Sequence, residues 1–93
     1  MERMERLCTL RPGERAVVTS LYHEEEMARR LKELGFVPGT AVTCVARSPA
    51  GDPSAYLVRG AVIALRERDA ALVGARPEPE GEPVPARARG QWA

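Results

Sequence analysis

Aromatic side chains are scarce in this chain of 93 residues, which has only one phenylalanine, one tryptophan and two tyrosines. A hydrophobic core must therefore be built mainly from Val, Leu, Ala and Ile, which are plentiful between residues 16 and 73. The scarcity also argues against recognition of proline-rich peptides, because the grooves that bind them are lined by stacked aromatic rings.

Long hydrophobic runs are missing as well, since none approaches the roughly 20 residues that a helix needs to cross a bilayer. The first ten residues carry charges at Glu2, Arg3, Glu5 and Arg6, unlike a secretory signal peptide. We therefore expect a cytoplasmic protein without direct membrane insertion. Its length is that of one small domain.

Neither a strong net charge nor a cysteine cluster is present. The formal charge is +1, so nucleic acid is not an expected partner. Cys8 and Cys44 belong to no Cys-x-x-Cys or Cys/His pattern, and a structural zinc site is not indicated. A disulfide between the two remains open, although a reducing cytoplasm favours free thiols.

Catalytic side chains are also few, because the only histidine is His23 and no nucleophile lies at a known spacing from it. We expect no enzymatic activity and no required cofactor. His23 and Glu24 are weak candidates for binding Fe²⁺ or another divalent transition metal. An exposed position at a helix start is the favoured interpretation, since consecutive side chains point in different directions.

Hydrophobic periodicity predicts about five short strands and one helix. In the helix, Met27, Leu31 and Leu34 form one apolar stripe, and Gly35 ends it. One short helical turn is expected at residues 67–72. The expected helix covers residues 23–34, and the expected strands cover residues 16–21, 41–47, 54–58 and 61–65, with Val73 as a last strand residue.

Glycine and proline mark the connections between these elements. The stretch "GFVPGT" from Gly35 is not a phosphate loop, because it lacks a lysine and follows a helix C-terminus, whose negative end repels anions. Asp52 is expected to bond the backbone of its own hairpin loop. The expected structural turn residues are Gly13, Gly35, Pro38, Gly39, Gly51, Asp52, Pro53 and Gly60.

Composition changes towards the C-terminus, where "GARPEPEGEPVPARARGQWA" holds four of the eight prolines. We expect a folded domain over residues 1–75 and a disordered tail rich in Pro, Glu and Arg over residues 76–93. For Trp92, a free side chain is the more common outcome and docking on another surface is the alternative. Five strands in so short a domain suit a small closed barrel, because closure removes sheet edges.

Four sequence blocks in one order resemble the FeoA family: "LRPGERAVV" from Leu10, "RRLKELGFVPGT" from Arg29, "SPAGDP" from Ser48 and "VRGAVIALR" from Val58. The resemblance implies a mainly β fold, a small SH3-like barrel of about five strands with one inserted α-helix. It also implies an accessory role in bacterial ferrous iron uptake, through protein–protein contact with the cytoplasmic part of the membrane transporter FeoB.

The contact surface is expected on the helix end and the following turn, by exposure and not by a family motif. For Phe36 and Val37, packing onto the core and forming an apolar knob for a partner are both open. The expected contact residues are Arg30, Leu34, Phe36 and Val37.

A similar domain forms the C-terminal part of iron-dependent repressors related to the diphtheria toxin repressor. The alternative function is therefore a metal-binding or metal-responsive regulatory module, although no helix-turn-helix precedes Leu7. Direct metal sensing would require a homo-oligomer, because one protomer supplies too few ligands. The oligomeric state is left open by the sequence.

Overall fold

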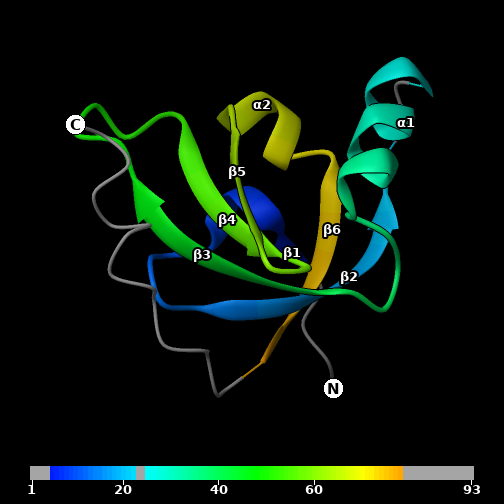
Figure 1. Ribbon diagram of the computed structural model, residues 1–93, viewed down its shortest axis with the longest axis horizontal. Coiled ribbons are helices and arrows are strands. Elements are labelled where there is room, and N and C mark those ends of the chain that lie inside the picture. The colour runs from blue at the N-terminus through cyan, green and yellow to red at the C-terminus, as the bar shows by residue number, and fades with distance from the viewer. Residues whose placement is uncertain (1–4, 23–24, 79–93) are drawn as a thin grey trace.

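A single curled antiparallel sheet with two α-helices forms the computed structural model, which describes residues 5–22 and 25–78 (Figure 1). The strand order across the sheet is β1-β6-β2-β3-β4-β5. A short 3₁₀ turn, η1 (Leu7–Thr9), follows the first strand. The helices are α1 (Glu25–Leu34) and α2 (Glu67–Ala70). The strands are β1 (Glu5–Arg6), β2 (Arg15–Leu21), β3 (Ala41–Arg47), β4 (Ser54–Val58), β5 (Ala61–Leu65) and β6 (Val73–Glu78).

The architecture confirms the predicted mainly β, SH3-like fold with a helix inserted after β2. The number of strands is six, however, and in the described residues no ladder joins the edge strands β1 and β5. The gap is filled by side chains instead, because Leu7 of η1, Ala70 of α2 and Leu65 of β5 belong to the same core cluster. In place of the expected closed barrel, the structure has a curled open sheet, and packed side chains fill the gap between its two edge strands.

Strand β6 extends past the predicted domain boundary at residue 75. Its register with β2 pairs Arg76 with Val17 and Glu78 with Arg15, and the Arg15 and Glu78 side chains form an ion pair at 3.5 Å. The polar composition of residues 76–78 predicts a tail. In the structure they pair with the edge of β2 instead. Residues 79–93 lie outside the described part, so their predicted disorder stays a prediction.

The core is built mainly from aliphatic side chains, as the scarcity of aromatic residues predicts, and it also buries two of the four aromatic residues. Its largest fully buried side chains include Tyr56, Phe36, Leu7 and Leu31. Helix α1 contributes Leu31 to this core, and Met27 packs against its edge. Neither described helix is long and apolar enough to cross a membrane.

The predicted turn glycines all adopt positive φ angles. In the Pro12-Gly13 turn, the N–H of Glu14 donates to the carbonyl of Arg11 at 2.9 Å, as in a type II turn. Arg59 also adopts a positive φ of 50° beside Gly60, in the two-residue connection between β4 and β5. The glycines are Gly13, Gly35, Gly39, Gly51 and Gly60.

Candidate functional site

Helix α1 ends in a Schellman motif, in which the residue after the closing glycine folds back against the last helical turn. The N–H of Phe36 donates to the carbonyl of Leu31 at 2.9 Å, and the N–H of Gly35 donates to that of Lys32 at 3.0 Å. Gly35 adopts a φ of +111°, a left-handed conformation that favours glycine. A Cβ there would also lie 3.2 Å from Cδ of Arg59.

The Schellman motif determines which way the side chain of Phe36 points. Its 6→1 hydrogen bond brings Phe36 beside Leu31, and both side chains are fully buried in the core. The expectation that Phe36 offers an apolar knob to a partner is therefore wrong, because the helix end turns the ring inward. Of the two interpretations, packing onto the core is the one that the structure supports for Phe36.

The other three expected contact residues differ in exposure. Arg30 is exposed and Val37 is half-buried. Leu34, on the predicted apolar stripe, is 42% exposed and is one of two large hydrophobic residues exposed in the described chain, with Tyr22. Within the apolar stripe, Leu31 is buried in the core whereas Leu34 is exposed. The spacing of apolar residues alone does not predict this difference in exposure.

The turn after Phe36 is tied to strand β2. The N–H of Thr40 donates to the carbonyl of Val37 at 3.0 Å, which closes a turn through Pro38 and Gly39. The N–H of Gly39 donates to the carbonyl of Val18 at 2.8 Å. The end of α1 and the exposed Leu34 are therefore held rigidly on the sheet.

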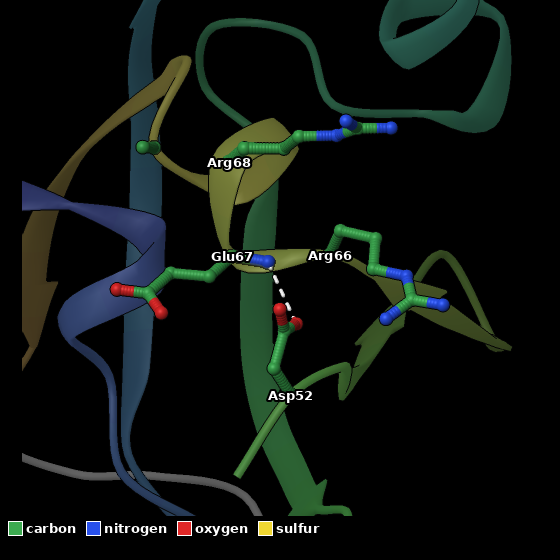
Figure 2. A pocket seen from close by; sticks show the side chains of 5 residues that line it. Asp52, Arg66, Glu67 and Arg68 are labelled. Carbon is green, nitrogen blue, oxygen red and sulfur yellow. Dashed lines mark hydrogen bonds between the residues drawn. The ribbon is translucent and has the colours of Figure 1, made fainter.

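Asp52 has a longer-range role than its loop suggests. Its carboxylate accepts a hydrogen bond from the N–H of Glu67, the first residue of α2, at 2.8 Å (Figure 2). The expectation was a bond to the backbone of the loop itself. Because the first N–H groups of a helix lack intrahelical partners, Asp52 caps α2 and anchors the β3–β4 loop to it.

An open hollow lies between this loop and α2, with a volume of about 660 Å³. Figure 2 shows the side chains of Arg66 and Arg68 extending from the same side of α2, while the Glu67 carboxylate points away from them. Two guanidinium groups can donate hydrogen bonds to a carboxylate or phosphate. This hollow was not predicted from the sequence, although the Arg-x-Arg spacing of Arg66 and Arg68 is a signal that could have indicated it.

The thiols and candidate metal ligands form no metal centre in the described chain. No group of three or more His, Cys, Asp or Glu side chains gathers within residues 5–22 and 25–78. Cys8 and Cys44 are free thiols. Burial raises the pKa of both thiols, and Glu67 adds to this effect at Cys8. Both therefore stay protonated and weakly nucleophilic at neutral pH.

His23 and Glu24, the weak metal candidates, lie outside the described residues, and their role stays a prediction. The described residues therefore present two surface features: the end of α1 around Leu34, and the arginine-lined hollow at α2. Neither assembles a nucleophile with a base among the residues that line it.

Comparisons with known proteins point to one family. A relative from Porphyromonas gingivalis (strain ATCC BAA-308 / W83), an Fe(2+) transport protein A/Fe(2+) transporter FeoB fusion protein, is 34% identical over 68 residues. These residues are 73% of this chain but only 8% of the relative. The chain thus corresponds to a small part of that protein.

Solved structures share the fold. Stenotrophomonas maltophilia FeoA complexed with zinc, described as a procaryotic SH3 domain protein, is 39% identical with a TM-score of 0.68, over 75% of this chain and 87% of that one. A manganese-dependent transcriptional repressor is 15% identical with a TM-score of 0.74, over 84% of this chain and 44% of that one. The low identity to the repressor shows a shared fold alone.

The sequence profile of the FeoA domain matches residues 5–77 of this chain. The match begins with β1 and ends within β6, so it covers nearly all of the described sheet. The chain therefore belongs to the FeoA domain family.

Proposed function

We propose that this protein is a non-catalytic, cytoplasmic accessory factor of bacterial ferrous iron uptake that contacts the membrane transporter FeoB. The observation that carries this proposal is the Porphyromonas relative, which joins an Fe(2+) transport protein A and FeoB in one fusion protein. A covalent link raises the effective concentration of each module near the other. Where the two are separate chains, a contact surface must replace the link.

The exposed end of α1 suits such a contact. Arg30 and Leu34 are four residues apart, so they lie on the same helix face. Leu34 presents an apolar side chain with a cation beside it, a combination that is common in protein interfaces. Val37 lies half-buried after the helix end, and the hydrogen bond that its carbonyl accepts from the N–H of Thr40 fixes its position in the turn. Phe36 supports this surface from the core and does not contact the partner.

Replacing Leu34 by glutamate is expected to weaken binding to the cytoplasmic part of FeoB by about tenfold or more, because the interface would desolvate an unpaired carboxylate. Titration of the purified transporter domain by calorimetry or surface plasmon resonance measures this loss.

The matched control is Ala64→Glu, which introduces the same charge at an exposed residue of β5. Both variants should retain the circular dichroism spectrum of the wild type. Wild-type affinity in Leu34→Glu, with lost affinity in Ala64→Glu, would place the contact at β5 and reject the α1 surface.

A metal-responsive module is the second candidate function, and the zinc complex of the Stenotrophomonas FeoA favours it. In this chain the candidate ligands are His23 and Glu24, supplied by several protomers of a homo-oligomer. Calorimetry with Zn²⁺ or Fe²⁺ is expected to show binding by the wild type that disappears in His23→Ala. The bound metal is also expected to increase the sedimentation coefficient of the wild type, because it joins protomers. No heat above the buffer control, or equal heat in His23→Ala, would remove this candidate.

A further inference from the structure

The curled sheet carries a second apolar cluster on the face opposite its core. Directly paired residues share a face, and the ladders pair Thr43 with Leu57 and Leu57 with Val62. The neighbouring residues Val42 and Val58 belong to the core, so this row points outward. The second cluster consists of Val45, Ala46 and Ala55, with Leu57 and Val62 packed against it.

This outward face is apolar where an open antiparallel sheet is normally polar. Val45, Ala55 and Thr43 are at most 2% exposed and so already buried, whereas Leu57 and Val62 on the same face are only half-buried. Both helices pack on the other side, since Leu31 of α1 and Ala70 of α2 belong to the core cluster. Within residues 5–22 and 25–78, no helical residue joins the second cluster.

A hollow of about 340 Å³ opens beside this cluster. Its lining is mixed: Ala41 and Leu57 form the apolar part, Thr40 and Thr43 carry hydroxyl groups, and Arg59 borders the hollow from the β4–β5 turn. An apolar surface next to a guanidinium group can bind an aromatic ring. The ring packs on the apolar side chains, and its π face attracts the guanidinium group. The ligand class that fits is therefore a single aromatic side chain.

The C-terminal segment of the same chain starts within reach of the hollow. Glu78, Arg15, Thr43 and Leu57 form one row of paired residues across four strands. At the usual strand spacing, the end of β6 lies roughly 14 Å from Leu57. An extended segment from Glu78 to Trp92 spans up to about 46 Å, so Trp92 reaches the hollow with slack.

We propose that Trp92 docks in the hollow beside Leu57 and Arg59. Trp92 is the only tryptophan and the only aromatic residue after Tyr56. Tethering gives it an effective concentration near millimolar, so a modest intrinsic affinity suffices. The inference is independent of the contact with FeoB, which uses the exposed end of α1.

The emission of Trp92 tests this directly, because the chain of 93 residues has no other tryptophan. Docking predicts a blue-shifted emission and several-fold weaker acrylamide quenching than in the free peptide of residues 79–93. It also predicts that Leu57→Lys and Arg59→Asn shift the emission back towards that of the peptide. Arg59→Asn keeps a residue that tolerates the positive φ of this turn, so the fold is retained.

The matched control is Glu26→Lys, which adds a lysine at an exposed position of α1 and should leave the emission unchanged. Emission of the wild type equal to that of the free peptide would overturn the proposal. A blue shift that persists in both Leu57→Lys and Arg59→Asn would exclude the hollow beside Leu57 as the docking site. A shift that grows with protein concentration would assign the hollow to the tail of a second copy and reject docking within one chain.

Discussion

Replacing Phe36 by alanine is expected to lower the free energy of unfolding by about 3–5 kcal/mol, the usual cost of deleting a buried phenylalanine ring. The ring is fully buried, and the Schellman motif holds it against Leu31. Its loss would leave a cavity where α1 joins the sheet, so the helix would lose its anchor as well as its contacts. Urea denaturation followed by circular dichroism measures the change.

Leu34→Ala is the control for this prediction, because Leu34 lies two residues earlier and is 42% exposed. It should cost less than about 1 kcal/mol, since surface substitutions seldom exceed that range. Equal losses in the two variants would contradict the inward orientation of Phe36. The pair therefore separates a structural residue from a contact residue within one short stretch.

Removing residues 76–93 is expected to destabilise the domain by about 1–3 kcal/mol, whereas removing residues 79–93 should leave the sheet intact. The difference lies in the end of β6. In the structure, Val17 pairs with Arg76, Ala16 with Pro77 and Arg15 with Glu78. The shorter chain loses these pairs and exposes the edge of β2 next to the buried Ala16.

Thermal unfolding of the two shortened chains measures this difference, with the full-length chain as reference. The chain ending at Glu78 should unfold well above the chain ending at Ala75. Equal stabilities would show that the last residues of β6 contribute nothing, and would restore the boundary at residue 75. A large loss on removing residues 79–93 would instead reflect docking of the tail.

The local elements follow closely from the sequence. The predicted ranges 41–47, 54–58 and 61–65 coincide with β3, β4 and β5. The helix ends at Leu34 as predicted, with Gly35 next to it in the left-handed region. These features depend on side-chain periodicity and on the backbone preferences of glycine and proline, both of which act over a few neighbouring residues.

The candidate site was predicted less completely. The sequence located the stretch from Arg30 to Val37, but exposure within it depends on which face of α1 meets the sheet. Phe36 turned inward and Leu34 outward, against the simple extension of the apolar stripe. Asp52 likewise bonds the N–H of Glu67, fifteen residues later, which no local turn rule predicts.

The sequence by itself determined the ranges of β3, β4 and β5, the end of α1 and the turns, and its four ordered blocks indicated the family. Only the tertiary structure decided that residues 76–78 pair with β2, that Phe36 belongs to the core and that a second apolar cluster forms on the other face of the sheet. The physical reason is that local preferences act between neighbours along the chain. Burial and strand pairing depend instead on partners such as Arg15 and Glu78, which folding alone brings together.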